Sequence, residues 1–297
     1  LKINHLQANK NMDPTKNSYS LDNPAPHELP AGHRIPVGVG FSTVYADMDF
    51  ETYSAAGHVF DMDAMKWKGL AKGQKGLPAV GAPVYAEHPS TEVTYLSYNL
   101  KQGGGPKWWK PGMCPPQDLF EFIAAGGVIE AHNSGFEYLI WLHVCHGRMG
   151  WPSLPLHQLR CSASKAGAHS MPRGLAKLGA ALELSELKDM AGSKVMLKLS
   201  MPRSPTKTNP AIRFTPENSP LDFKRLYAYG DQDIITESAA SARLPDLSDV
   251  ELELWLLDQT INMRGVAIDT GNRDHCLAIV EQATERYTKE LFTLTGG

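Results

Sequence analysis

The chain has 297 residues, of which 42% are hydrophobic and 21% are charged, a composition typical of a globular protein with a sizeable core and room for an appendage. Its 29 Lys and Arg residues are slightly outnumbered by 32 Asp and Glu, which excludes a protein that coats nucleic acid through bulk positive charge. No apolar run is long enough to cross a bilayer, and the four cysteines do not form a disulfide framework, so we expect a cytoplasmic protein with no membrane contact.

Residues 1–36 mix Asn, Pro, His, Lys and Ser with little apolar periodicity, and they predict a poorly ordered N-terminal arm. The chain begins with Leu1 rather than Met and stops just after a helical pattern. We therefore expect it to be a piece of a longer protein.

The first half of the remaining chain predicts an α/β fold. An apolar, β-leaning run ending at Asp49 predicts the first strand, and a Lys- and Gly-rich stretch over 60–80 predicts an inserted loop. The elements expected after it are strands over 84–88, 92–98 and 128–132 and helices over 117–125 and 136–149. Strands followed by alternating helices and strands are typical of a mixed sheet flanked by helices.

The second half is mainly helical. The pattern predicts helices over 173–182 and 222–243, with a Pro-, Thr- and Asn-rich loop over 202–220 before the second of them. Two further helices, over 249–264 and 272–292, have an amphipathic rhythm of their own. They predict the start of a second, helical module.

The first strand carries the most informative residues. Asp49 and Glu51 are two residues apart, so their side chains point to the same face of a strand. Two carboxylates held this close repel each other unless a cation or a shared proton neutralises them. Hard carboxylate oxygens favour Mg²⁺ or Mn²⁺ over zinc. Taken alone, however, an Asp-x-Glu pair is more often part of a solvated face.

Two later segments supply the rest of such a site. Glu137 falls in the first turn of a helix directly after a buried strand, from which a carboxylate can reach the neighbouring strand end. Tyr229 and Asp233 are four residues apart on the long helix and share one of its faces. Four carboxylates and a tyrosine in this order predict a two-metal phosphodiester site.

These residues resemble the three motifs of the 3′→5′ proofreading exonuclease domain of phage-type family A DNA polymerases, in the carboxylate-dependent superfamily whose third motif carries a tyrosine. The first motif is matched by 49–52, the second by 133–137 and the third by 229–233. One departure is Glu137, because the second motif of the superfamily usually ends in Asp. Further stretches similar to this family are 85–93, 194–202 and, toward the polymerase module, 244–248 and 257–265.

The resemblance implies a ribonuclease H-like mixed sheet in an exonuclease domain over 37–244, followed over 245–297 by the truncated helical start of a polymerase thumb. It implies two divalent ions, Mg²⁺ or Mn²⁺, with Asp49 bridging both, Glu51 and Asp233 completing the first, and Glu137 holding the second through water. Tyr229 would orient the attacking water. The implied reaction is proofreading hydrolysis of the terminal phosphodiester at a 3′ end of DNA, with release of nucleoside 5′-monophosphates.

The implied partners are a single-stranded 3′ end of DNA and the remainder of a polymerase chain, for a monomer in the cytoplasm of a host cell. Trp108 and Trp109 lie between two lysines, which suits stacking on unpaired bases, although a Gly/Pro loop of this kind is as often an aromatic plug over a core. Asn133 and Phe136 are further candidates for DNA contact, with helix capping and core packing as the simpler interpretations.

Other charged and metal-ligating residues have simpler interpretations. His143, Cys145 and His146 do not complete a zinc site because no fourth ligand is apparent, and ordinary packing is favoured. The basic residues that could line the DNA backbone, with a solvated face as the default interpretation, are Arg173, Lys188, Lys194, Lys198 and Arg203.

Two alternative functions stay open. An RNA-trimming exonuclease of the same superfamily would use the same carboxylates, although the polymerase-like stretch over 244–269 argues against it. A catalytically silent module that binds the primer strand or braces a polymerase is disfavoured, because all the expected carboxylates and Tyr229 are present. Glu137 is the position at which such a loss of activity could lie.

Overall fold

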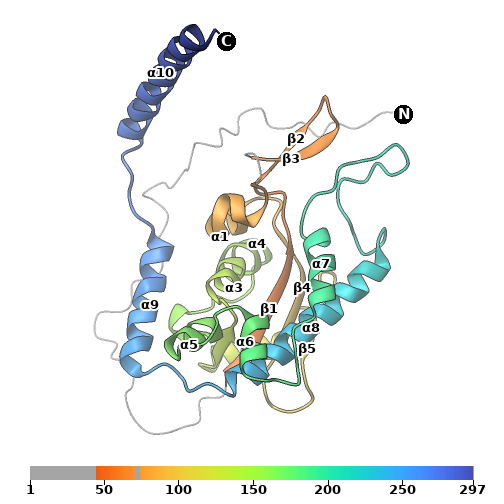
Figure 1. Cartoon of the computed structure of the whole chain (residues 1–297). Helices are drawn as coiled ribbons and strands as arrows, with labels where there is room; N and C mark the ends of the chain where they lie inside the picture. The colour runs from red at the N-terminus through yellow and green to blue at the C-terminus, as the bar shows by residue number, and fades with distance from the viewer. Residues whose placement is uncertain (1–44, 71–73, 297) are drawn as a thin grey trace. The chain divides into compact units, whose positions relative to one another are not determined.

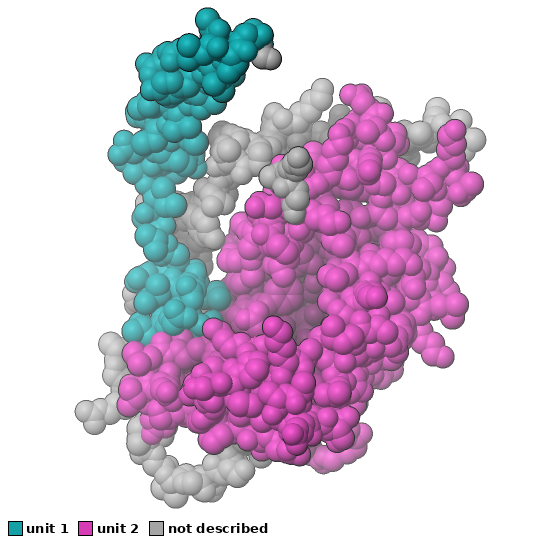
Figure 2. All heavy atoms as spheres, in the orientation of Figure 1, with its two compact units in different colours: residues 1–38, 257–297 teal, residues 39–256 magenta. Residues whose placement is uncertain are grey.

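The computed structural model describes residues 45–70 and 74–296. The predicted arm over 1–36 lies outside the described residues. The chain divides into two compact units, one of residues 39–256 and one that contains 257–297, and Figure 2 colours them separately. The predicted domain boundary at 244/245 stays a prediction.

A five-stranded mixed sheet, in the order β5-β4-β1-β6-β7, forms the centre of the larger unit. β1 pairs antiparallel with β4, and β4 with β5, whereas β6 runs parallel to β1 and β7 parallel to β6. The strands are β1 (Tyr45–Tyr53), β4 (Glu92–Asn99), β5 (Lys107–Trp109), β6 (Val128–Ala131) and β7 (Leu159–Cys161). The structure confirms the mixed sheet flanked by helices that the sequence predicted.

Helices lie on both sides of this sheet (Figure 1). α1, α3 and the π-helical turn after α3 lie on one side of the sheet. α8 packs on β1 and β4 from the other side, and α7 packs against α8. The helices of this unit are α1 (Leu77–Glu87), α2 (Gln117–Ala124), α3 (Gly135–Ile140), the π-helical turn (Trp141–His146), α4 (Gly147–Met149), a 3₁₀ turn (Leu156–Gln158), α5 (Ser162–Ala168), α6 (Leu175–Ala181), α7 (Met190–Leu199) and α8 (Pro220–Ser241).

The face of the sheet on the α3 side is apolar. Met48 and Phe50 alternate onto it from β1 and are buried. The Phe50 ring lies 6.4 Å from the ring of Trp141, which packs in turn against Phe120 of α2 at 6.2 Å and against Trp151 at 5.4 Å. This cluster of large rings anchors the strand that carries the first two candidate carboxylates.

The opposite face, covered by α8, is polar. Asp47, Asp49 and Glu51 alternate onto it from β1. Residues directly opposite each other in an antiparallel pair share a face, and Asp49 is paired with Ser97 and Glu51 with Tyr95 of β4. A row of carboxylates therefore runs along the central strand beneath α8.

Two segments differ from the sequence prediction. Residues 84–88, predicted as a strand, belong mainly to the end of α1, a helix with a proline in its first turn and a kink at Gly81, where φ is 78°. Val84 and Tyr85 are good strand formers, but packing buries Tyr85 on a helix instead, because tertiary contacts override a weak local preference. The region predicted as a loop contains most of a hairpin, β2 (His58–Asp61) with β3 (Lys66–Gly69), and the start of α1.

Among the described residues, five further short elements were not predicted, namely β5, β7, α5, α7 and the 3₁₀ turn Leu156–Gln158. The two strands have only three residues each, too few to display a period of two. α7 begins at a side-chain cap, in which Asp189 accepts hydrogen bonds from the amides of Ala191 and Gly192. These elements form through contacts with the rest of the unit.

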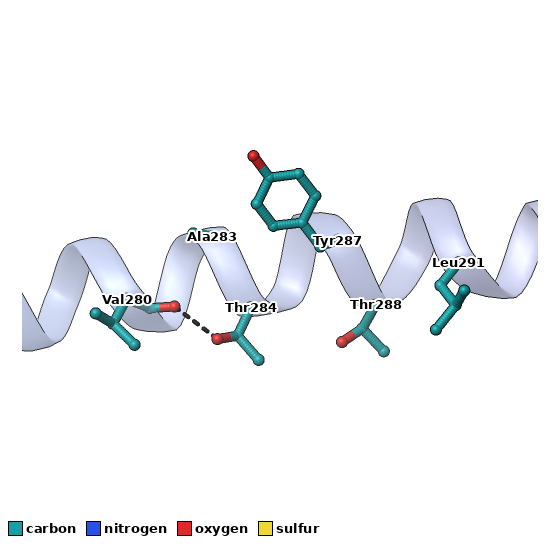
Figure 3. A pocket seen from close by; sticks show the side chains of 6 residues that line it. All are labelled: Val280, Ala283, Thr284, Tyr287, Thr288 and Leu291. Carbon is teal, nitrogen blue, oxygen red and sulfur yellow. Dashed lines mark hydrogen bonds between the residues drawn. The ribbon is translucent and has the colours of Figure 1, made fainter.

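Two helices follow close to their predicted ranges, α9 (Asp249–Arg264) and α10 (Thr270–Thr295). Ser248 and Glu251 form a reciprocal cap at the start of α9, and Asp269 caps α10 through the amide of Asn272. No helix among the described residues is long and apolar enough to span a membrane. A pocket on α10 is lined by residues of this helix alone (Figure 3), namely Val280, Ala283, Thr284, Tyr287, Thr288 and Leu291.

Candidate active site

Asp49 and Glu51 lie on the central strand, where neighbours on both sides fix the backbone. A β-bulge interrupts the register just after Glu51, and Thr94 of β4 is the extra residue. The Thr94 hydroxyl donates a hydrogen bond of 3.0 Å to the carbonyl oxygen of Glu51. The bulge re-aims the strand next to the candidate site, a position at which bulges are common.

α8 brings Tyr229 and Asp233 over the same face of the sheet, and both side chains are buried. Close approach of this helix depends on Gly230. A Cβ at Gly230 would lie 3.1 Å from the ring of Tyr95 and 3.6 Å from Cγ of Glu51, so a larger residue would push α8 away from the strands. The glycine places the third predicted segment against the first.

Glu137 lies on α3, which follows β6, the strand on the other side of β1 from β4. β6 runs parallel to β1, and the chain turns sharply at Asn133 (φ 71°) before α3 begins, so Glu137 falls in the first turn of that helix and is buried. Asn tolerates a positive φ better than most residues, because its short polar side chain relieves the strain. Ser134, rather than Asn133, is the N-cap residue, and Asn133 is exposed.

The charges of these four carboxylates act on one another. Burial raises the pKa of Asp49 to about 7; the Asp233 charge adds to the rise, and Lys188 opposes it. Burial, followed by the charges of Asp49 and Asp233, raises the pKa of Glu51 well above its usual value. Burial and the Asp49 charge do the same for Glu137. We refer to Asp49, Glu51, Glu137 and Asp233 as the Asp49 cluster.

Two oxygens of the Asp49 cluster are incompletely paired. Oε2 of Glu137 is buried and accepts no hydrogen bond from any described residue. Oδ1 of Asp233 is buried and accepts no well-angled hydrogen bond from the described residues, although the Tyr229 hydroxyl interacts with the Asp233 carboxylate and lowers its pKa. An unpaired buried carboxylate oxygen is costly unless a cation meets it. A set of hard oxygen ligands fits Mg²⁺ or Mn²⁺ chemically. Within 45–70 and 74–296, however, no group of three or more His, Cys, Asp or Glu side chains is arranged so that it could hold a metal ion.

Tyr229 lies beside this cluster with its phenol kept neutral. Burial, and then the charges of Asp233 and Glu51, raise the pKa of Tyr229 above its usual value. A neutral phenol keeps a proton that it can donate in a hydrogen bond at neutral pH. Lys188 lies 4.8 Å from the ring centroid of Tyr229 and forms an ion pair with Asp233.

The two candidate tryptophans are placed differently. Trp109 is 5% exposed and packs on Trp151 with ring centroids 4.8 Å apart, which is the core-plug interpretation. Trp108 is 46% exposed and lies on the α8 side of the sheet, opposite Ser97 in the register. Its ring is stacked 6.3 Å from the ring of Tyr95. Only Trp108 of the pair presents a surface to a ligand.

A basic and aromatic patch surrounds Trp108. Tyr95 is stacked on Tyr227 at 4.7 Å, and Nζ of Lys110 lies 5.6 Å from the ring of Trp108 and 5.2 Å from the ring of Tyr227. Because Tyr95 is the register partner of Glu51, this patch borders the Asp49 cluster. The name aromatic patch is used below for Trp108, Tyr95, Tyr227 and Lys110.

The remaining predicted residues make ordinary contacts. Phe136 is half-buried, with its ring 5.8 Å from that of Tyr85. Nδ1 of His146 lies 2.7 Å from the carbonyl oxygen of Trp151, and Nε2 of His143 lies 3.8 Å from Oε1 of Glu87. These contacts support the packing interpretation of the histidines over a zinc site.

Sequence reasoning missed a second acidic group on the same face. Glu130 of β6 is the register partner of Asp47, and Glu237 lies four residues after Asp233 on α8. We call Asp47, Glu130, Glu237 and the buried Lys165 of α5 the Lys165 cluster. Extending the two periodicities by one step, from 49 to 47 and from 233 to 237, would have found two of its members.

The comparisons with known proteins bear on this site. No protein-family model matches the chain. Over 230 residues the chain is 31% identical to a DNA polymerase of Bacillus phage SP02, an alignment that covers 73% of this chain and 33% of the polymerase. The chain thus spans about a third of the length of that relative, a DNA polymerase to which its sequence is similar.

Proposed function

We propose that this chain is a metal-dependent 3′→5′ exonuclease domain of a phage-type DNA polymerase, with a ribonuclease H-like fold, that removes nucleotides from the 3′ end of DNA. The observation that carries the proposal is the Asp49 cluster, in which four buried or partly buried carboxylates from β1, α3 and α8 act on one another's pKa values beside Tyr229. The similarity to a phage DNA polymerase supports DNA as the substrate.

In this proposal Asp49, Glu51, Asp233 and Glu137 hold two divalent ions, Mg²⁺ or Mn²⁺. When bound, such ions lower the pKa of a water ligand and stabilise charge on the transferring phosphoryl group. Oε2 of Glu137 and Oδ1 of Asp233, which accept no well-angled hydrogen bond from the described residues, would supply ligand positions for these ions. Glu137 has one more methylene than the Asp that the family usually carries, which suits a contact made through water.

Tyr229 orients the attacking water, because its phenol stays protonated and lies beside the carboxylates. The oxygen of this water forms the new bond to phosphorus. The bond from phosphorus to the 3′ oxygen of the preceding nucleotide breaks, and that oxygen takes up a proton. The products are a nucleoside 5′-monophosphate and a strand one nucleotide shorter.

The aromatic patch is the place where we expect the unpaired strand to lie. Exposed Trp108 offers a ring face to a base, and the ammonium of Lys110 offers a charge to the adjacent phosphate. Asn133, exposed at the turn before α3, is a second candidate contact at the 3′ end. α9 and α10 are proposed as the start of a thumb, with the remainder of a polymerase as their partner.

Digestion of a 5′-labelled single-stranded DNA tests this function, in Mg²⁺, in Mn²⁺ and in EDTA. We expect a ladder that shortens from the 3′ end with either metal and disappears in EDTA and in an Asp49→Ala/Glu51→Ala variant. The matched control is Asp63→Ala/Glu121→Ala, which removes two exposed carboxylates from the hairpin and α2. An RNA of the same sequence, digested as fast as the DNA, would favour an RNA-trimming enzyme, and strand binding without any ladder would favour a silent module.

A further inference from the structure

Lys188 brings a positive charge to the edge of the Asp49 cluster. Its Nζ forms an ion pair with Oδ2 of Asp233, and it lies 4.8 Å from the ring centroid of Tyr229. The side chain of Lys188 is 21% exposed, whereas that of Asp233 is 8% exposed. The ammonium therefore lies between solvent and the buried carboxylates.

The neighbours of Lys188 hold it there through contacts that do not involve its own side chain. Nε2 of Gln232 donates a hydrogen bond of 3.2 Å to the carbonyl oxygen of Leu187. Asp189 caps α7 with one carboxylate oxygen and pairs with Arg225 through the other. Because Gln232 and Arg225 both belong to α8, the segment is fixed to the helix that carries Asp233. A substitution at Lys188 should leave this backbone in place.

Lys188 and a divalent ion require the same carboxylate. Oδ2 of Asp233 pairs with Lys188, whereas its Oδ1 accepts no well-angled hydrogen bond from the described residues, and the Tyr229 hydroxyl interacts with the same carboxylate. The Lys188 charge also acts on Asp49 and Glu51, so it neutralises part of the cluster and not a single residue. Positive charges a few ångströms apart repel by several kcal/mol even at an effective dielectric constant of about 20. The ammonium and a metal ion bound at Asp233 would therefore exclude each other.

We propose that Lys188 is a resident counter-ion of the Asp49 cluster, which a divalent metal ion displaces from Asp233. This inference rests on the proposed function, because it takes the cluster as the metal site. Without metal, the ammonium balances part of the negative charge and keeps Asp233 and Tyr229 in place. When an ion enters, the partly exposed lysine side chain moves outward into solvent. Lys188 acts as a positioning residue that sets how tightly metal is bound.

If Lys188 competes with metal, replacing it should raise the affinity for metal. If its role is only structural, replacing it should lower that affinity. Replacing Lys188 by Met removes the competing charge and keeps an unbranched side chain, so metal should bind about tenfold more tightly or better. A structural lysine whose loss disturbed the cluster would weaken metal binding instead. Lys188→Arg keeps the charge and should keep the affinity of the wild type.

Measuring the affinity of the whole chain for Mn²⁺, without DNA, shows whether the substitution raises or lowers it. The electron paramagnetic resonance signal of free Mn²⁺ gives the dissociation constant for wild type, Lys188→Met, Lys188→Arg and Lys177→Met. Lys177 is an exposed lysine on α6, and its substitution makes the same change in net charge away from the cluster. Melting temperatures in EDTA show that each variant is folded, and Lys188→Met should melt lower than wild type there and recover in Mn²⁺.

Tighter binding by Lys188→Met alone supports the inference. Equal or weaker binding by a folded Lys188→Met overturns it, and a wild-type chain that still shortens DNA would then leave the proposed function standing. If Mn²⁺ binding is the same after Asp49→Ala/Glu51→Ala, the ion binds elsewhere, and both the inference and the proposed metal site are wrong.

Discussion

The two acidic clusters on the α8 face of the sheet are neighbours on β1, yet their charges are balanced in different ways. In the Lys165 cluster, Nζ of Lys165 lies 3.3 Å from Oε1 of Glu130, 2.8 Å from Oγ of Ser241 and 2.8 Å from Oδ1 of Asp246. Ser241 also donates a hydrogen bond to Glu130. Lys165 is therefore a buried cation whose partners are all supplied by the chain.

The other acids of the Lys165 cluster also have partners within the chain. Glu237 accepts a hydrogen bond of 2.9 Å from Ser162. Asp47 makes no well-angled hydrogen bond with any described residue, but Nζ of Lys101 lies 2.8 Å from its Oδ1 and balances its charge. A buried charge network completed by its own cations fits a structural role.

The Asp49 cluster is left incomplete. Lys188 at its rim pairs with Asp233, and one oxygen each of Glu137 and Asp233 accepts no well-angled hydrogen bond from the described residues. Both clusters are built from the same residue types on the same face, so burial and acidity do not separate them. What separates them is whether the chain supplies the balancing charge, and we assign function to the cluster where it does not.

The largest difference is expected from two substitutions on α8, four residues apart. Asp233→Asn removes a proposed metal ligand and should lower the exonuclease rate by about 10³-fold, the size of effect seen when a charge-stabilising group is removed. Glu237→Gln should change the rate by less than about threefold, because Glu237 accepts a hydrogen bond from Ser162, and burial, followed by the charge of Asp47, raises its pKa well above its usual value. Rates on labelled single-stranded DNA in Mg²⁺ give both numbers. Equal losses of exonuclease rate in the two variants would contradict a functional difference between the two clusters.

The second difference concerns stability. Lys165→Met should lower the free energy of unfolding by about 3–5 kcal/mol, because Glu130 would stay buried without its cation. Lys177→Met, on an exposed face, should change it by no more than about 0.5 kcal/mol. Urea unfolding in EDTA measures both. A loss below about 1 kcal/mol for Lys165→Met would mean that Lys165 does not hold its cluster together.

The third prediction concerns pH in the absence of metal. The pKa of Asp49 is about 7 in the folded chain, above its value in the unfolded chain, so the folded state holds this proton more tightly. The resulting stability is fully present below about pH 4 and is lost as pH rises through 7, by an amount on the order of 4 kcal/mol. Melting temperatures in EDTA from pH 4 to 8 should therefore fall with pH.

Adding Mg²⁺ in the same experiment distinguishes the contributions of the two clusters to the pH dependence of the melting temperature. Glu237 also has a raised pKa, so part of the fall with pH belongs to the Lys165 cluster. Metal should restore only the part that belongs to the Asp49 cluster, and the gap between melting curves in Mg²⁺ and in EDTA should widen with pH. A gap that is constant from pH 4 to 8, or unchanged in Asp49→Asn, would count against a metal site at Asp49.

The smallest expected effect is at the aromatic patch. Trp108→Ala removes an exposed ring face and should weaken binding of a short single-stranded DNA about tenfold, at the lower end of base stacking on aromatic side chains. Met62→Ala, an exposed apolar residue on the β2–β3 hairpin side, is the control. Fluorescence anisotropy in EDTA measures binding without cleavage. Equal affinities for wild type and Trp108→Ala would show that the DNA strand does not bind at this patch.

The sequence predicted the parts of the site that depend on local periodicity. Asp49 and Glu51 were expected on one face of a strand, and Tyr229 and Asp233 on one face of a helix, and β1 and α8 carry them, with β1 extending to Tyr53, four residues beyond its predicted end. Glu137 was expected in the first turn of a helix after a buried strand, and it lies there. Their roles as metal ligands and catalytic groups stay predictions.

The parts that escaped prediction depend on tertiary contacts. Lys188 was interpreted by default as part of a solvated face, because nothing in its neighbourhood in sequence shows that Gln232 and Arg225 fix the segment to α8. Lys165 lies on a helix of seven residues that carries no periodic signal of its own. The charge balance that distinguishes the two clusters could not be read from the sequence for this reason.

The most direct test uses the isosteric variants Asp49→Asn and Asp47→Asn, two residues apart on the same face of β1. Each is incubated with a 5′-labelled single-stranded DNA and Mg²⁺, beside the wild type. We predict that wild type and Asp47→Asn produce a ladder shortening from the 3′ end and that Asp49→Asn produces none. A ladder from Asp49→Asn as strong as that of wild type, or no ladder from folded wild type that binds the strand, would contradict the assignment of the Asp49 cluster as a metal-dependent exonuclease site.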